Sequence, residues 1–269
     1  MIQTEIISSE ELKRYLGLLD NMEILDMENG RYTCMGAFDD ETQTGMGVLV
    51  AEVLTECIHI KRIYVKPEYR RMGVSKKLLQ IITDLPEELK QPVVAYGVNE
   101  ELDQGFLDAM GFHEIKSEYT YLEGSLGDYQ KLPFPDKGSE YSLLPVDRVS
   151  ANALKNYMLE IQKKKSIQIP ELFAGDEQFS DGSIVCLKGH QIVAVILLDE
   201  APQYIMVPFV FGKDKKAVLY SFAVLREELS GEYGPDARIR FLLNKGRGRE
   251  AIEKIVANTI EKEILIYQL

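Results

Sequence analysis

Apolar residues near the N-terminus form three short runs bounded by polar turn residues. The runs are residues 31–38, 45–54 and 57–65, and the polar segment 39–44 separates the first two. Short runs rich in β-branched and aromatic residues predict strands. We expect the first two strands to pair as a hairpin and the third to end before Pro67.

Helical spacing of apolar residues predicts three helices in the same half of the chain. Ser8-Ser9-Glu10-Glu11 precedes spaced apolar residues and indicates a capped helix start. After Gly73, five apolar residues fall on one helix face, and Gly111 stands in the stop position of the next helix. The predicted helices span about residues 8–19, 74–85 and 99–110. Between the last two, the nearly all-apolar run 92–98 predicts a strand covered on both faces.

The second half repeats this order of elements. A helix is expected at about residues 149–162, then a hairpin (183–187 and 191–198), a strand (203–211), a helix (215–229), a strand (237–243), a helix (248–257) and a last strand (263–269). An order of elements that occurs twice indicates a repeated domain, and strands alternating with helices indicate an α/β or α+β class. Two prolines, a glycine and polar residues at 133–140 predict a linker. The predicted domains are therefore residues 1–132 and 141–269.

Composition narrows the class of protein. The chain has 269 residues, 45% of them hydrophobic, which suits one or two domains with a real core. No apolar run reaches the ~18 residues of a membrane span, and the acidic N-terminus leads into no apolar signal core. Three separated cysteines and three scattered histidines argue against a disulfide framework and a metal cluster. We expect a cytoplasmic protein without a metal site and without a membrane partner.

Charge is distributed unevenly along the chain. The net charge is −12, which disfavours a nucleic-acid partner. Residues 1–132 carry a net charge of −11, yet residues 61–77 within them carry +6. A basic segment in an acidic domain indicates either a local anion site or a solvated helix end.

The loop that joins the third strand to the helix after Gly73 carries the candidate chemistry. It contains Arg70-Arg71-Met72-Gly73-Val74-Ser75, without the order of a Walker A or GxGxxG loop. Glycine allows close backbone approach, a helix N-terminus offers free N–H groups and a positive dipole end, and arginine matches phosphate oxygens. The loop therefore suits a phosphate or pyrophosphate group.

These residues resemble motif A of the GNAT superfamily of acyl-CoA-dependent N-acyltransferases. The family pattern is Q/R-x-x-G-x-G/A, and Arg70-x-x-Gly73-x-Ser75 matches it except for the small residue Ser75. Val65-x-Pro67-Glu68-Tyr69 before it and the segment 106–112 (FLDAMGF) resemble neighbouring family motifs. The resemblance covers roughly residues 30–123. It implies two tandem GNAT-like domains, each a mixed, mostly antiparallel sheet flanked by helices, the second degenerate and without a phosphate loop.

The resemblance also implies a cofactor, acetyl-CoA or another acyl-CoA. Amides from Arg71 to Ser75 would hold the pyrophosphate, Arg70 would shape the turn, and Lys76 or Lys77 would reach the ribose phosphate. The backbone of Ile63 and Val65 would pair with the pantetheine arm, and Asn99 would contact it. The full set of expected cofactor residues is Ile63, Tyr64, Val65, Arg70, Arg71, Met72, Gly73, Val74, Ser75, Lys76, Asn99 and Phe106.

Amine acylation needs a base for the amine and a proton for the departing thiolate. The family's base position falls on His59, with Glu56 as the nearby carboxylate alternative; a packed strand histidine is the competing interpretation. The family's tyrosine acid is replaced by Leu107; Tyr119, Tyr96 or Tyr121 could substitute, or the thiolate could leave without a dedicated acid.

The sequence thus predicts an N-acetyltransferase that moves an acetyl group to a primary amine by direct attack in a ternary complex. The acidic remainder of the first domain favours a cationic small-molecule or peptide amine. The alternative is a catalytically inactive CoA-binding sensor or interaction module. Both a monomeric pseudo-dimer and a homodimer remain open.

Overall fold

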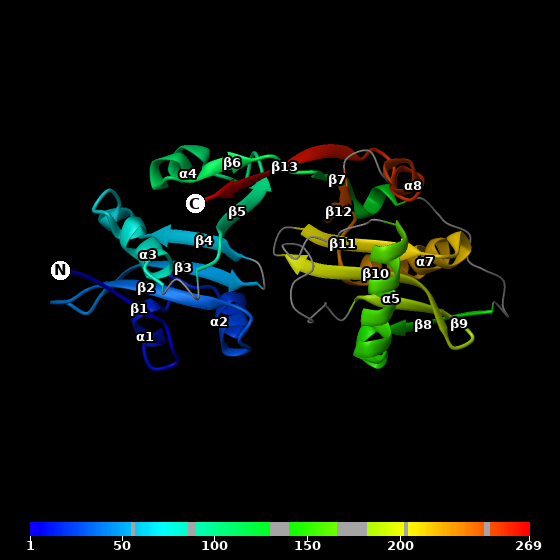
Figure 1. The fold of residues 1–269 in the computed structure, drawn as a ribbon, viewed down its shortest axis with the longest axis horizontal. Helices are drawn as coiled ribbons and strands as arrows, with labels where there is room; N and C mark the ends of the chain where they lie inside the picture. The colour runs from blue at the N-terminus through cyan, green and yellow to red at the C-terminus, as the bar shows by residue number, and fades with distance from the viewer. Residues whose placement is uncertain (55–56, 86–89, 130–139, 166–181, 202–203, 245–247) are drawn as a thin grey trace. The chain divides into compact units, whose positions relative to one another are not determined.

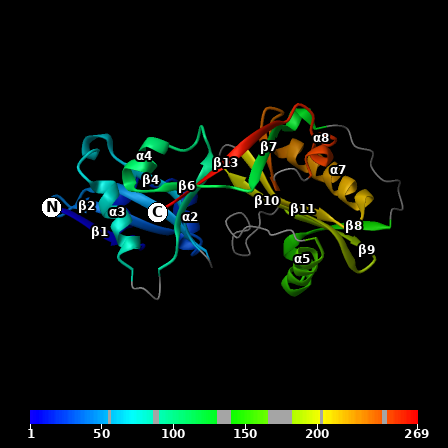
Figure 2. The ribbon, with the colours of Figure 1, turned by 45° about the horizontal axis from the view of Figure 1, so that its top comes forward.

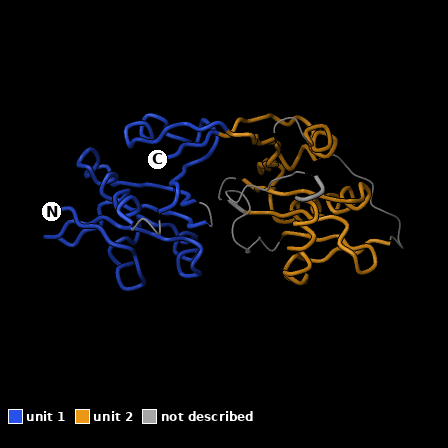
Figure 3. The backbone as a smooth tube through the Cα atoms, in the orientation of Figure 1, with its two compact units in different colours: residues 1–116, 265–269 blue, residues 117–264 orange. Residues whose placement is uncertain are grey.

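A computed structural model describes residues 1–54, 57–85, 90–129, 140–165, 182–201, 204–244 and 248–269. The chain forms two compact units, shown in Figure 3: unit 1 is Met1–Lys116 with Leu265–Leu269, and unit 2 is Ser117–Ile264. The predicted linker 133–140 lies almost wholly outside the described residues, so the predicted domain boundaries stay a prediction. No helix in the described parts of the chain is long and apolar enough to cross a bilayer.

Unit 1 is a mixed sheet with helices on both faces (Figure 1). Its strand order is β1-β2-β3-β4-β5, followed by the last residues of β13 and then β6, and the β4–β5 pair is parallel. The strands are β1 (Ile2–Ile6), β2 (Thr33–Asp39), β3 (Gly45–Val53), β4 (Ile58–Val65), β5 (Val93–Val98), β6 (His113–Ile115) and β13 (Ile260–Gln268). The helices are α1 (Leu12–Tyr15), α2 (Asn21–Glu28), α3 (Val74–Thr83) and α4 (Gln104–Met110).

Unit 1 has two hydrophobic cores, one on each face of its sheet, and side chains of one strand alternate between them. On β3, Leu49 and Ala51 belong to the core under α3 and α4, whereas Val48 and Val50 belong to the core that includes Tyr15 of α1. Successive side chains of a strand point to opposite faces, so one strand serves both layers. The near-continuous burial of β3 follows from this double coverage.

A bulge in β4 opens the middle of the unit 1 sheet. Val50 pairs with Arg62 and Ala51 with Ile60, so Lys61 is an extra residue on β4. β4 and β5 pair only at Ile58↔Val93 and His59↔Val94, and no later pair of these strands occurs among the described residues. A bulge bends its strand and increases the local twist. The two parallel strands therefore separate beyond His59.

Unit 2 repeats the same plan. Its strand order is β8-β9-β10-β11-β12-β7, with the first residues of β13 on β7, and among the described strand pairs of this unit only β11–β12 is parallel. Figure 2 shows α5 and α7 on opposite sides of this sheet. The elements are β7 (Tyr119–Ser125), β8 (Tyr141–Pro145), α5 (Ala151–Lys165), β9 (Ile184–Lys188), β10 (Gln191–Ala201), β11 (Tyr204–Gly212), α7 (Lys215–Glu232), β12 (Arg238–Asn244) and α8 (Arg249–Glu253).

The predicted fold class is confirmed, and most predicted strands and helices are present. The predicted helix at 8–19 is wrong in extent: it covers only Leu12–Tyr15, because Leu16 is extended and Gly17 has a φ of 84°. The sequence analysis did not predict β1, α2, β6, β7 or β8. These elements are short, and α2 has no buried residue, so none of them carries a long apolar period.

Candidate active site

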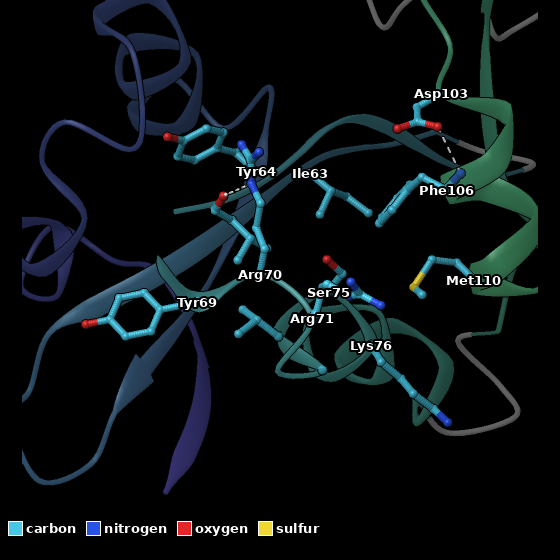
Figure 4. A pocket seen from close by; sticks show the side chains of 13 residues that line it. Ile63, Tyr64, Tyr69, Arg70, Arg71, Ser75, Lys76, Asp103, Phe106 and Met110 are labelled. Atoms are coloured by element: carbon cyan, nitrogen blue, oxygen red, sulfur yellow. Dashed lines mark hydrogen bonds between the residues drawn. The ribbon is translucent and has the colours of Figure 1, made fainter. Parts of the chain in front are cut away.

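A cleft of about 540 Å³ opens in unit 1 beside the separated end of β4 (Figure 4). Its walls come from β4, the loop before α3, the first turn of α3, and α4. The lining residues are Ile63, Tyr64, Val65, Tyr69, Arg70, Arg71, Gly73, Val74, Ser75, Lys76, Asp103, Phe106 and Met110.

The N-terminus of α3 forms the polar end of the cleft. Gly73 is the N-cap residue, with a φ of 83°, and none of the described side chains caps this helix end. The amide of Lys77 makes the first helical hydrogen bond, to the carbonyl of Gly73 at 3.1 Å. The N–H groups of the first turn of α3 have no partner within the helix and can bind a ligand, and this turn contains no acidic residue. This end of the helix therefore favours an anion.

Two arginines shape and charge the loop before α3. Arg70 Nε donates to the carbonyl oxygen of Val65 at 3.2 Å, which ties the loop to the end of β4. Arg71 has a φ of 64°, so the backbone turns sharply here, and its side chain lines the cleft beside Ser75 (Figure 4). Guanidinium groups and helix amides together fit a phosphate or pyrophosphate.

The opposite wall of the cleft is apolar and is carried by α4. Asp103 caps this helix, because its Oδ1 accepts a hydrogen bond from the Phe106 amide at 3.0 Å. Phe106 and Met110 lie one helical turn apart and face Ile63 across the cleft (Figure 4). A ligand with an anionic end and a long, largely apolar arm matches these two walls, which is the chemistry of an acyl-CoA.

His59 is buried on β4 at the last parallel pair with β5, and it is not among the described residues that line the cleft. It is 3% exposed, and its ring stacks on Tyr96 of β5 with centroids 3.9 Å apart. Burial lowers the pKa of His59 to about 4, although the neighbouring Glu52 opposes this shift. His59 is therefore a neutral imidazole at physiological pH.

Glu52 lies on β3 opposite His59, and it is 6% exposed. One carboxylate oxygen is 3.8 Å from Nδ1 of His59 and 3.8 Å from Nζ of Lys61, and the other is 3.8 Å from Nε of Arg31. Burial opposes ionisation, but these three neighbours outweigh it and hold the pKa of Glu52 below its usual value. The carboxylate is ionised at neutral pH.

The corresponding helix of unit 2 begins differently. α7 follows β11 and is capped by Asp214, whose carboxylate accepts a hydrogen bond from the Lys216 amide at 2.8 Å. The hydroxyl of Tyr141 also donates to this carboxylate. A carboxylate from the chain itself thus occupies the helix end that is uncapped in α3.

Residues 5–125 match the family model of the acetyltransferase (GNAT) domain. This part of the chain is therefore similar to GNAT acetyltransferase domains. Its family match spans the uncapped helix, the arginine loop and the cleft, and GNAT domains are acyl-CoA-dependent acyltransferases that generally use acetyl-CoA. No curated protein matches the sequence significantly.

Solved structures share the fold of this chain at low sequence identity. A tandem GNAT protein from the clavulanic acid biosynthesis pathway has a TM-score of 0.68 and 11% identity, covering 100% of this chain and 98% of its own. A probable N-acyltransferase from Enterococcus faecalis has a TM-score of 0.60 and 10% identity, covering 100% and 72%. A GCN5-related N-acetyltransferase from Kribbella flavida has a TM-score of 0.59 and 12% identity, covering 99% and 70%.

The cleft brings together most of the expected cofactor residues. Met72 is 56% exposed and does not line it, and the Asn99 side chain instead accepts a hydrogen bond from Gln104. Sequence analysis missed Tyr69, Asp103 and Met110. Asp103 could have been found as a helix cap three residues before Phe106, and Met110 by its spacing of four from Phe106.

The expected catalytic residues are not gathered in the cleft. Glu56 lies outside the described residues. Tyr119 is on β7 in unit 2, where it pairs with Asn244, and burial raises its pKa. Leu107 is buried in the core under α3 and α4. In the described parts of the chain, no three His, Cys, Asp or Glu side chains are close enough to hold a metal ion.

Proposed function

We propose that this protein is an N-acetyltransferase that moves an acetyl group from acetyl-CoA to a primary amine by direct attack in a ternary complex. One observation carries the proposal: the uncapped N-terminus of α3, with basic residues around it, opens onto a cleft whose other wall is apolar. The polar end suits a pyrophosphate and the apolar wall suits a pantetheine arm.

Within this proposal, each wall of the cleft has a task. The amides from Arg71 to Ser75 hold the pyrophosphate, and Arg70 keeps the loop on the end of β4. The backbone of Ile63 and Val65 lies on the edge of β4 that leaves β5, so its polar groups can pair with the amides of the arm. When bound, the cofactor supplies the activated acetyl group as a thioester.

His59 is the proposed base. As a neutral imidazole it can take the proton that the amine loses when its nitrogen bonds to the acetyl carbon. It lies where β4 and β5 begin to separate, four residues before Ile63 of the cleft. Tyr119 remains a proposed acid and Glu56 the alternative base.

We further propose that unit 2 holds no second acyl-CoA. Asp214 already supplies a carboxylate to the start of α7, so a pyrophosphate there would meet negative charge. The acidic residues of the first 132 positions outside 61–77 favour a cationic acceptor amine.

The first test is calorimetric titration of the protein with acetyl-CoA, beside the variants Gly73→Glu and Gly17→Glu. Both glycines have nearly the same positive φ, and a Cβ would meet nothing within 4 Å at either, so the backbone strain is matched. Only Gly73 lines the cleft. We expect micromolar binding by the natural protein and by Gly17→Glu, and loss of binding by Gly73→Glu.

Turnover is then measured over a panel of cationic, neutral and anionic primary amines. Acetylation of at least one amine, lost in Gly73→Glu, supports the transferase. Tight acetyl-CoA binding without turnover of any amine would favour the inactive CoA-binding module. No binding by the natural protein would overturn both.

A further inference from the structure

We propose that Glu52 is a positioning residue, which holds His59 in the tautomer that carries its proton on Nδ1 and leaves Nε2 free to accept the proton of the amine. The catalytic part of this inference rests on the proposed function of His59. The tautomer itself is a property of the protein alone, and can be tested without substrate.

The two side chains are placed opposite each other by strand register. Glu52 of β3 and His59 of β4 are antiparallel partners, one pair before the bulge at Lys61. Directly opposed residues project from the same face of the sheet with their Cβ atoms close together. Tertiary pairing thus fixes this contact, although the two residues are close in sequence.

Both facing groups are buried, and the described structure shows an ion-pair distance but no hydrogen bond between them. Nδ1 of His59 is a buried nitrogen without a hydrogen-bond partner. His59, Lys61 and Arg31 each have a side-chain nitrogen 3.8 Å from a carboxylate oxygen of Glu52, and for His59 this is about 1 Å beyond hydrogen-bond length. A buried nitrogen without a hydrogen bond is unfavourable, so a small side-chain shift that joins Nδ1 of His59 to the carboxylate of Glu52 is favourable.

The surroundings restrict which shift can occur. Stacking on Tyr96, with the ring planes 18° apart, limits tilting of the imidazole. Lys61 and Arg31 keep Glu52 ionised, and an ionised carboxylate can only accept a hydrogen bond. A hydrogen bond between His59 and Glu52 therefore requires the proton on Nδ1 of His59. Nε2, on the other side of the ring, then carries the lone pair.

The role of Glu52 in the reaction follows from the positions of the protons on His59. The amine proton passes to Nε2, while the Nδ1 proton stays in the bond to Glu52. The imidazolium formed in this way lies beside a carboxylate that stabilises its charge. Glu52 neither touches the acceptor nor takes a proton.

The direct test is ¹H–¹⁵N correlation of the histidine side chains by NMR at neutral pH. The chain has three histidines, and His113 and His190 are exposed, so His59→Gln identifies the resonances of His59. We expect a protonated Nδ1 and an unprotonated Nε2 in the natural protein. In Glu52→Gln the side-chain amide can donate to Nδ1, and the populations should shift to the Nε2–H tautomer, whereas Glu52→Asp should keep the Nδ1–H form.

Glu123→Gln is the matched control. Glu123 is similarly buried, with 12% of its side chain exposed against 8% for Glu52, and three cationic side chains surround it on unit 2. This variant should leave the His59 resonances unchanged. The same tautomer in the natural protein and in Glu52→Gln, or an Nε2–H form in the natural protein, overturns the inference.

Kinetics separate positioning from structural support. Glu52→Gln should lower kcat by about 10²-fold or more, because the other tautomer of His59 removes the general base, whose usual contribution has this size. The affinity for acetyl-CoA should be unchanged. Glu52→Asp should recover part of kcat. A correct tautomer shift without a change in kcat would overturn the catalytic role. If the natural protein turns over no amine, the proposed function fails, while the NMR result still decides the tautomer.

Discussion

At the scale of single residues, burial determines the chemistry of the candidate base. His59 would be half protonated near pH 6.5 in an unfolded chain, but burial lowers its pKa to about 4 in the folded protein. The same burial that makes it a neutral acceptor at pH 7 makes its protonation destabilising. Of its charged neighbours, Glu52 raises the pKa of His59 and Lys61 lowers it, and burial has a larger effect than either.

This shift predicts a measurable pH dependence of stability. Between about pH 6.5 and pH 4 the unfolded chain binds more protons than the folded one at His59, so stability falls as the pH falls. The loss from this residue should reach roughly 3 kcal/mol at pH 4. Urea unfolding at pH 7 and pH 4 should show it, and His59→Gln should lose less over the same range. An equal loss in the variant would contradict the buried, neutral histidine.

At the scale of elements, two equivalent helices differ in one detail of their first turn. α3 begins at Gly73 without a side-chain cap, and α7 begins at Asp214, whose carboxylate binds the helix amides. A capped end satisfies its own N–H groups, and an uncapped end is less stable but open to a ligand. The cap residue therefore distinguishes a binding helix from a structural one.

The variant Ser75→Asp tests this relation on α3. A carboxylate in the first turn should stabilise the helix by about 0.3–1 kcal/mol through the helix dipole. The same charge should repel a pyrophosphate, so acetyl-CoA affinity should fall at least tenfold while the melting temperature stays equal or rises. Thermal unfolding and calorimetry measure the two effects on one sample. A loss of stability together with affinity would contradict the role assigned to this helix end.

At the scale of the whole molecule, the last strand contributes to both units. Ile260 to Glu263 of β13 pair with β7 in unit 2, and Ile266 to Gln268 pair with β6 in unit 1. Tyr267 is buried in the core under α3 and α4, and the amide of Leu269 donates to the carbonyl of Val93 at 2.9 Å. Unit 1 is thus completed by residues from the far end of the sequence.

Deletion of residues 265–269 should therefore destabilise unit 1. Each large apolar side chain removed from a core costs about 1.5–3 kcal/mol, and three residues of this segment belong to that core. We expect a loss of several kcal/mol and of acetyl-CoA binding, whereas Ile260→Ala, at an exposed position of the same strand, should change little. Hydrogen exchange locates the effect: protection of α3 and β4 that persists after the deletion would contradict this prediction.

The sequence by itself determined the elements that carry strong local patterns. The loop from Arg70 to Ser75 and the helix after Gly73 were predictable, because charge, glycine and apolar period lie within a few consecutive residues. So were the hairpins and the duplicated order of strands and helices. Most residues that line the cleft come from these segments or from α4, whose end was marked by Gly111.

Only the tertiary structure decided the features that depend on pairing. The register of β3 and β4 brings Glu52 to His59, the bulge at Lys61 separates β4 from β5, and β13 completes unit 1. Burial of His59, which sets its pKa, likewise depends on Tyr96 from another strand. Strand partners, bulges and burial arise from contacts between separate segments, and local residue patterns do not specify these contacts.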